Sequence, residues 1–487
     1  MYLTSGSSRG GFAPRGVRSR GGRAPHFTKT REQLKPDIER HPLGVIVETI
    51  RSSGLSVGAI GSTQIPEISG CKYVASYNWL NSEVPTIIVP GKPPRWTPLV
   101  TPQRLREDSG QYYRDHNAAK YPEYPIAPVV HAVVGTSPEF PTASVDIFAC
   151  GSTLGNLLRF ARGIDKAFRF NIELVGNTVF FIRKENGPKE LIKDVRGFGH
   201  TFPEAYTTWD NDVKESETHQ RIIQYTFGGL NCLVRFESDG YIKDVSTGND
   251  KVPDGGTADE DDLLQALQNT AISHPFKKFS KTMDRISVNH GGSVVPQSSI
   301  FDLKTRSGKH NKDINMSDIL PQLWLKQIPN FILAYHDGHG LFQDIRVQDI
   351  RNDVQTWQTE NQDGIRRFAT LLAKIVRVVK NEKRVLLEVY CPGSDRLEIR
   401  GQYGDGMHAL PMQLADRWAE DGSETGLVTL GPSGDEDHGL DDDEEELSDN
   451  SPRVLDRNFD DDCDSDTEQD FTACSPDGCG YCGKCTY

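Results

Sequence analysis

Two short segments of the sequence carry acidic and basic side chains in a pattern that suits metal-dependent chemistry. One ends an apolar run with Glu237 and Asp239, and the other contains Asp302 and Lys304. Both segments are expected to be strands, where alternate side chains share a face. Carboxylate oxygens hold Mg²⁺ or Mn²⁺, and such an ion polarises a phosphoryl oxygen and activates water. We therefore predict a site for phosphodiester hydrolysis, with Lys304 positioning water or offsetting charge on the phosphate.

The elements that must position these residues follow from apolar runs and turn residues. Gly228 and Gly229 separate two runs whose second delivers Glu237 and Asp239, which predicts a hairpin. Gly176 and Asn177 mark another hairpin in the same way. The expected strands are, in chain order, 44–49, 56–60, 145–150, 168–175, 178–183, 221–227, 231–236, 331–335, 385–390 and 396–400.

Three helices are expected around these strands. Ser152 is a suitable cap for a helix that runs to about residue 162. Asp318 is a suitable cap for a second helix ending near Gln327, with Pro321 tolerated in its first turn. Apolar residues form one stripe along residues 363–380, which predicts an amphipathic helix.

Strands and helices of this kind predict an α/β fold with a mixed twisted sheet flanked by helices. We expect one domain over residues 41–420, with its core at 144–400. Proline-rich turns are expected between residues 85 and 102. Residues 245–292 interrupt the pattern and are predicted to be an inserted loop, which at this length is either functional or disordered.

The two ends of the chain have opposite charge. Residues 1–31 carry seven basic residues and no acid, whereas residues 435–470 carry 18 acidic and 2 basic residues. Neither composition can bury a core. We predict a disordered Arg/Gly-rich tail over 1–40, which can follow a nucleic-acid backbone, and a disordered acidic linker over 421–470.

The order of motifs resembles the PD-(D/E)xK nuclease superfamily and, within it, the DXO-type decapping exoribonucleases. That family carries W-R-G-x-L-x-x-L-L, an N-G-T turn, G-x-x-F-E, E-x-D, E-x-K and Q-S-F-L-x-G-I-P in this order. Gly151 stands where the family has arginine, and Asp302 stands where it has glutamate. The resembling segments are Cys150–Leu158, Gly176–Phe180, Gly199–Glu204, Glu237–Asp239, Asp302–Lys304 and Gln322–Pro329.

The resemblance implies a PD-(D/E)xK nuclease-like core and metal-dependent hydrolysis of RNA, as 5′-end decapping or exonuclease activity. The catalytic residues it implies are Asp302, Lys304 and Gln322, with Lys304 orienting the attacking water. The Mg²⁺ or Mn²⁺ ligands it implies are the carboxylates of Glu204, Glu237, Asp239 and Asp302 and the backbone carbonyl of Leu303. The alternative is a protein on the same fold that binds nucleic acid or acts as a scaffold without catalysis.

A cysteine cluster lies in the last segment of the sequence, residues 471–487. Its spacing is C-x4-C-x2-C-x2-C, and the intervening glycines permit the tight turns of a tetrahedral zinc site. The alternative is a set of free or redox-active thiols. The candidate Zn²⁺ ligands are Cys474, Cys479, Cys482 and Cys485.

The remaining cysteines are scattered and predict free thiols in a reducing compartment. No apolar stretch reaches the length of a membrane span, and no secretory signal is visible. We expect a nuclear or cytoplasmic protein whose partner is RNA or another nucleic acid, with no membrane association.

Overall fold

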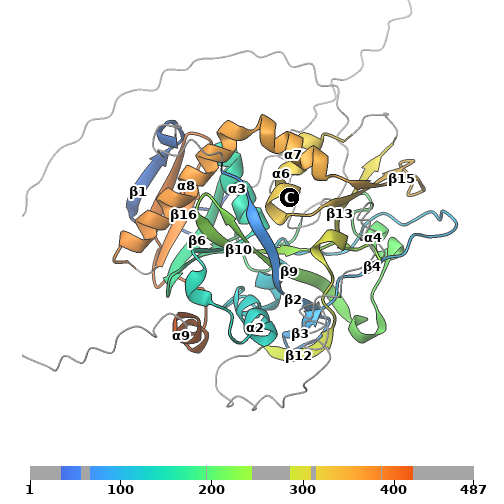
Figure 1. The fold of residues 1–487 in the computed structure, drawn as a ribbon, viewed down its shortest axis with the longest axis horizontal. Coiled ribbons are helices and arrows are strands. Elements are labelled where there is room, and N and C mark those ends of the chain that lie inside the picture. The colour runs from blue at the N-terminus through green and yellow to red at the C-terminus, as the bar shows by residue number, and fades with distance from the viewer. Residues whose placement is uncertain are drawn as a thin grey trace, which may run out of the picture.

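The computed structural model describes residues 35–55, 66–192, 195–243, 286–308, 314–384 and 386–420. Over these ranges the strands form two sheets, and helices lie against them (Figure 1). The predicted mixed α/β fold with flanking helices is confirmed. The acidic linker, the cysteine cluster and residues 1–34 of the basic tail lie outside the described residues.

The larger sheet has eleven strands and mixes parallel with antiparallel pairs. In spatial order these are β1 (Ile46–Arg51), β17 (Arg396–Gly401), β16 (Leu386–Cys391), β6 (Phe168–Val175), β7 (Thr178–Arg183), β5 (Ile147–Cys150), β10 (Leu230–Glu237), β9 (Ser216–Phe227), β2 (Ser69–Leu80), β3 (Thr86–Gly91) and β12 (Ser287–Gly292).

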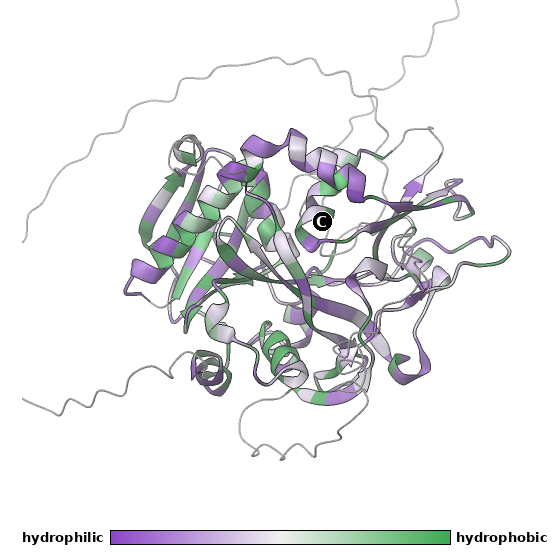
Figure 2. Cartoon of the chain, in the orientation of Figure 1, coloured by the Kyte–Doolittle hydropathy of each residue, from purple (hydrophilic) through white to green (hydrophobic). Residues whose placement is uncertain are grey.

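The smaller sheet has six strands. Its spatial order is β15 (Phe342–Asp349), β14 (Asn330–His336), β13 (Ile300–Ser307), β11 (Gly240–Tyr241), β4 (Arg95–Trp96) and β8 (Thr207–Thr208). The edge strand β15 is mostly hydrophilic and exposed (Figure 2). Polar side chains of this kind discourage an edge strand from pairing with another chain.

The helices cover both faces of the larger sheet. One face packs on α3, α6 and α8 through an extended apolar cluster, and the opposite face packs on α2 and α9. The helices are α1 (His116–Lys120), α2 (Ala127–Thr136), α3 (Gly151–Ala161), α4 (Thr201–Tyr206), α6 (Leu320–Lys326), α7 (Arg351–Glu360), α8 (Gln362–Asn381) and α9 (Met412–Glu420). None of the helices in the described ranges has the length and apolar composition needed to cross a membrane.

Local sequence determined several of these elements. Strands β6 and β7 have the predicted bounds, and Gly176 between them adopts the positive φ of 58° that the turn requires. Helix α8 covers the predicted amphipathic segment. Its buried residues include Ile365, Phe368 and Leu372, which recur at the expected spacing.

Other local expectations were wrong. The N-cap of α3 is Cys150, and the Ser152 hydroxyl lies 3.1 Å from the Cys150 sulfur instead of capping the helix. The N-cap of α6 is Ile319 because a 3-10 turn takes up the residues before it, although Pro321 does lie in the first turn. These helices begin where tertiary packing places them.

Two segments expected to be irregular form strands. Part of the proline-rich segment is β3, which pairs with β2 and β12. The last six residues of the predicted inserted loop are β12, and residues 245–285 of that loop lie outside the described residues, as does the expected strand at 56–60. Strands β2 and β3 extend the larger sheet beyond the predicted core, because β9 pairs with β2 and β12 pairs with β3 from distant parts of the chain.

Candidate active site

Strand β13 presents Asp302 and Lys304 on one face and Phe301 and Leu303 on the other. Asp302 and Lys304 are buried, with exposed fractions of 4% and 8%. Phe301 and Leu303 point to the opposite side, into an apolar cluster with Phe202 of α4. This alternation follows from the pleat of the strand, and it confirms that Asp302 and Lys304 share a face.

Asp239 reaches the same place from the larger sheet. It lies between β10, which ends at Glu237 in the larger sheet, and β11, which begins at Gly240 in the smaller one. Because β11 pairs with the start of β13, Asp239 comes alongside, and its Oδ2 accepts a 2.6 Å hydrogen bond from the backbone N–H of Leu303. The site therefore forms where the chain crosses from one sheet to the other.

Two lysine ammonium groups hold the carboxylate of Asp302. Lys304 Nζ lies 2.6 Å from Asp302 Oδ1 and also donates to the backbone carbonyl of Leu303 at 3.1 Å. Lys326 Nζ lies 3.3 Å from Asp302 Oδ2. We call Asp239, Asp302, Lys304 and Lys326 the acid–lysine cluster. It pairs two carboxylates with two ammonium groups.

Lys326 was not predicted from the sequence as a site residue. Its side chain is 1% exposed and passes close to the first turn of α3, where a Cβ added to Gly151 would lie 3.6 Å from Lys326 Cγ and Cε. A lysine within the apolar run of α6 is a usable signal, because a buried ammonium requires an acidic partner. Local sequence does not identify that partner as Asp302.

The electrostatic environment shifts the pKa values of Asp239 and Asp302 in opposite directions. Burial and the neighbouring charge of Asp302 raise the pKa of Asp239 to about 6, against the opposing effect of the two lysines. Burial also acts to raise the pKa of Asp302, but Lys304 and Lys326 outweigh it and hold that pKa below its usual value. Asp302 is therefore a fixed anion, while Asp239 titrates nearer neutrality.

Two further predicted residues lie on the elements that form the cluster. Glu237 ends β10 and accepts a 3.2 Å hydrogen bond from Gln220 Nε2 of β9. Gln322 is buried on α6, four residues before Lys326, so both lie on the same face of the helix. The proposal below gives them a supporting role.

Glu204 occupies a different environment. It is exposed on α4, and burial together with the charge of Asp108 raises its pKa. Tyr112 is part of the same surroundings, since the charges of Asp108 and Glu204 add to burial in raising its pKa. Of the four predicted acids, Asp239 and Asp302 are the two that the structure joins in one cluster.

The cluster offers a divalent ion the oxygens of two carboxylates and one backbone carbonyl. Within the described ranges, no group of three or more His, Cys, Asp or Glu side chains is arranged to hold a metal. Mg²⁺ usually keeps several waters and takes only one or two protein carboxylates. The Lys304 ammonium lies between Asp302 Oδ1 and the Leu303 carbonyl, so the two oxygens already converge on one cationic group. The same oxygens, with Asp239, are suitable ligands for one hydrated divalent ion.

A family model described as "Domain of unknown function (DUF8563)" matches residues 56–400. The chain belongs to this family. The matched residues include all of the acid–lysine cluster, so the cluster is part of the DUF8563 domain. No curated protein matches the chain.

Several solved structures have a similar fold. Rai1 of Scheffersomyces stipitis, in complex with (3′-NADP)+ and calcium ion, is 12% identical with a TM-score of 0.48, over 77% of this chain and 99% of that one. Candida albicans Rai1 in complex with pU5-Mn2+ is 8% identical with a TM-score of 0.45, over 77% and 99%. K. lactis Dxo1 in complex with manganese is 9% identical with a TM-score of 0.41, over 77% and 100%. Rai1 and Dxo1 are thus among the structural neighbours of this DUF8563 protein, as the sequence resemblance predicts.

Proposed function

We propose that this protein hydrolyses RNA with the help of one Mg²⁺ or Mn²⁺ ion at the acid–lysine cluster. The observation that carries the proposal is the convergence of Asp239, Asp302 and Lys304 at the junction of the two sheets. The motif order that resembles the DXO-type decapping exoribonucleases supports RNA as the substrate and its 5′ end as the point of attack.

In this proposal the carboxylates of Asp239 and Asp302 and the Leu303 carbonyl would hold the ion. Such an ion would polarise a phosphoryl oxygen and lower the pKa of a bound water. The water oxygen forms a bond to phosphorus and loses a proton, the bond from phosphorus to the leaving oxygen breaks, and the leaving oxygen takes up a proton. Lys304 orients the water and offsets the developing negative charge. Glu237 and Gln322 support the cluster from β10 and α6.

Lys326 has a positioning role in the same proposal. It binds Asp302 Oδ2 while Lys304 binds Oδ1, so the carboxylate is fixed in one orientation. A buried carboxylate held at both oxygens loses little freedom when a ligand arrives, which favours a preorganised site.

The cysteines of the described residues are free thiols, as expected in a reducing compartment, nuclear or cytoplasmic in this proposal. They are Cys71, Cys150, Cys232 and Cys391.

The test is a cleavage assay on RNA labelled at its 5′ end, with Mn²⁺ or with EDTA. Wild-type protein is expected to release label only with Mn²⁺. Asp302→Asn should lower the rate by at least about a thousandfold, an effect of about 4 kcal/mol on the barrier. Asp344→Asn is the matched control, because Asp344 lies exposed on β15 of the same sheet. Cleavage by the Asp302→Asn protein at the wild-type rate would refute the proposal.

A second candidate function is RNA binding without hydrolysis. Both oxygens of Asp302 hold ammonium groups, and the two acids and two lysines balance, which favours a cluster that needs no metal. In that case RNA binds and is not cut. Lys326→Met would then release Asp302 Oδ2, and Mn²⁺ binding measured by calorimetry should become tighter than in the wild type. Under the hydrolytic proposal the wild type already binds Mn²⁺ and cleaves.

A further inference from the structure

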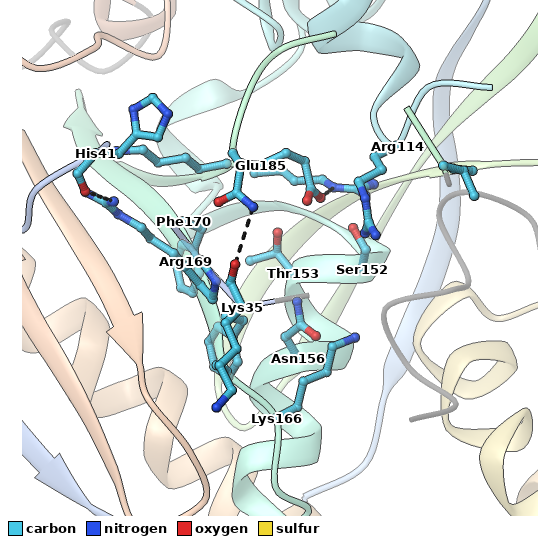
Figure 3. Close-up of a pocket in the computed structure, with 17 residues that line it drawn as sticks. Lys35, His41, Arg114, Ser152, Thr153, Asn156, Lys166, Arg169, Phe170 and Glu185 are labelled. Carbon is cyan, nitrogen blue, oxygen red and sulfur yellow. Dashed lines mark hydrogen bonds and ion pairs between the residues drawn. The ribbon is translucent and has the colours of Figure 1, made fainter. Parts of the chain in front are cut away.

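A second candidate site lies across the first turn of α3 from the acid–lysine cluster. It is a pocket of about 90 Å³ between that helix, strands β6 and β7 and the segment 35–42 (Figure 3). About 10–15 Å³ of such volume admits one water, so the pocket has room for one tetrahedral anion. Six lysine and arginine side chains line it, against one acid, Glu185. They are Lys35, Arg114, Lys166, Arg169, Arg183 and Lys184, and we call this feature the cationic pocket.

One of these basic residues builds the wall of the pocket. Arg169 donates to the backbone carbonyls of His41 (2.6 Å) and Pro42 (3.1 Å) and pairs with the wholly buried Glu388 at 2.6 Å. Asn186 donates to the carbonyl of Lys35 at 3.3 Å. These bonds hold the segment 35–42 over the strands, so the pocket does not depend on a ligand for its shape.

Four of the six basic side chains that line the pocket pair with only three acids. Glu388 is shared, since Lys184 lies 3.5 Å from the oxygen that Arg169 also contacts. Arg183 pairs with Glu185 at 2.7 Å, and Arg114 lies 3.5 Å from Glu190. Burial and the charge of Arg169 lower the pKa of Lys184 despite Glu388. Crowded cations in a partly buried space are stabilised by an added anion.

Neutral groups of α3 complete the lining. Ser152, Thr153 and Asn156 face the pocket, and no side chain caps the start of the helix at Cys150. Hydroxyl, amide and helix N-terminal N–H groups donate to phosphate oxygens, and the helix dipole adds to the attraction. Asn156 lies with Lys35 and Lys166 at one end of the pocket, and Arg114 with Ser152 at the other (Figure 3).

We propose that the cationic pocket binds a phosphate group of the RNA chain whose hydrolysis is proposed above. A Cβ added to Gly151 would lie 3.6 Å from Lys326 of the acid–lysine cluster, while Ser152 and Thr153 line the pocket. Consecutive residues thus face the two features. A phosphate held in the pocket fixes the RNA beside the cluster.

The experiment measures RNA affinity in EDTA, so it does not depend on cleavage. Lys35→Ala/Lys166→Ala is compared with the control Lys189→Ala/Lys214→Ala, which removes the same charge at exposed positions outside the pocket. Fluorescence anisotropy gives the Kd of a short RNA over a range of salt concentrations. Losing the charge that neutralises one phosphate of a single strand should lower the slope of log Kd against log salt by about 0.7 and weaken binding about tenfold or more at low salt. The control should stay close to wild type.

Two arms identify the source of the phosphate. The same oligonucleotide is used with a 5′-monophosphate and with a 5′-hydroxyl. A loss confined to the 5′-phosphorylated RNA assigns the pocket to the terminal phosphate, and an equal loss in both assigns it to an internal phosphodiester. Equal slopes in the pocket variant and its control would overturn the proposal. A protein that binds in this way but never cleaves RNA would refute the proposed hydrolysis alone.

Discussion

The acid–lysine cluster and the cationic pocket lie on either side of one helix turn but handle charge in opposite ways. In the cluster, two carboxylates meet two ammonium groups. Asp302, Lys304 and Lys326 are buried, and Asp239 is half-buried. In the pocket, six basic side chains meet one lining acid. The charges of the acid–lysine cluster balance one another, which holds its side chains in place for chemistry. The cationic pocket has an excess of basic side chains, which favours binding of an anion from outside the protein. We therefore expect that mutations can change catalysis and RNA binding separately.

After Asp302→Asn, the largest expected effect comes from Lys304→Ala. Removing the ammonium that orients water should lower kcat by about 10² to 10³ with RNA affinity nearly unchanged. Asp302 keeps Lys326 as a partner, so the protein should fold. Steady-state cleavage with Mn²⁺ measures both parameters.

The counterpart is the pocket variant Lys35→Ala/Lys166→Ala in the same assay. It should raise KM and leave kcat at saturation near wild type, because its lysines do not touch the reacting atoms. If both variants change kcat and KM in the same proportion, the separation of the two regions is wrong.

The next prediction concerns the stability contributed by Glu388, the acid that pairs with Arg169 in the wall of the pocket. Glu388 is fully buried and accepts hydrogen bonds from Arg169 and from the backbone N–H of Gly44. Glu388→Gln leaves the Arg169 guanidinium without its charged partner, which should lower the free energy of unfolding by about 3 kcal/mol. Urea denaturation measures this value. Glu360→Gln, at an exposed position on α7, should change it by less than about 0.5 kcal/mol.

Asp239→Asn should stabilise the protein in a pH-dependent way. The pKa of Asp239 is raised to about 6 in the fold, so its ionised form costs stability. That cost is small at pH 4, grows between about pH 4 and pH 6, where the unfolded state loses the proton that the folded state keeps, and stays constant at higher pH. At pH 7 the variant should exceed wild type by on the order of 2 kcal/mol, while hydrolysis is lost. Denaturant unfolding at pH 4 and pH 7 tests it, and an equal difference at both values would contradict the raised pKa.

The smallest expected effect is that of Gly151→Ala. The added Cβ meets Lys326 and Phe236 at 3.6 to 3.7 Å, which is ordinary contact. Alanine also suits a helix better than glycine, so the unfolding free energy should change by less than about 0.5 kcal/mol and cleavage should persist. A large loss of cleavage with normal stability would show that Lys326 needs more freedom than the structure indicates.

The sequence predicted the parts of this molecule that local patterns determine. Alternation along β13 placed Asp302 and Lys304 on one face, and Gly176 with Asn177 marked the turn between β6 and β7. The pairing of Lys326 with Asp302 joins residues 24 positions apart on different elements. No periodicity encodes such a pair, because tertiary packing of α6 against the first turn of α3 creates it.

Long-range pairing also explains the strands that were missed. Strand β12 pairs in parallel with β3, and β3 pairs with β2. The β12 partner of β3 and the β9 partner of β2 come from distant parts of the chain, and Pro90 and the glycines of β3 and β12 are typical of turns. Local composition therefore favoured loops where the completed sheet stabilises strands.

Strand β13 pairs in parallel with β14 from Phe301 opposite Asn330 to Ser307 opposite His336. A shift of one residue in this pairing would turn Asp302 and Lys304 into the apolar layer and bring Leu303 next to Lys326. Such a misaligned molecule would keep its strand content yet lose every polar contact of the cluster. The proposed chemistry is thus tied to strand alignment, so cleavage would report on correct assembly of the smaller sheet.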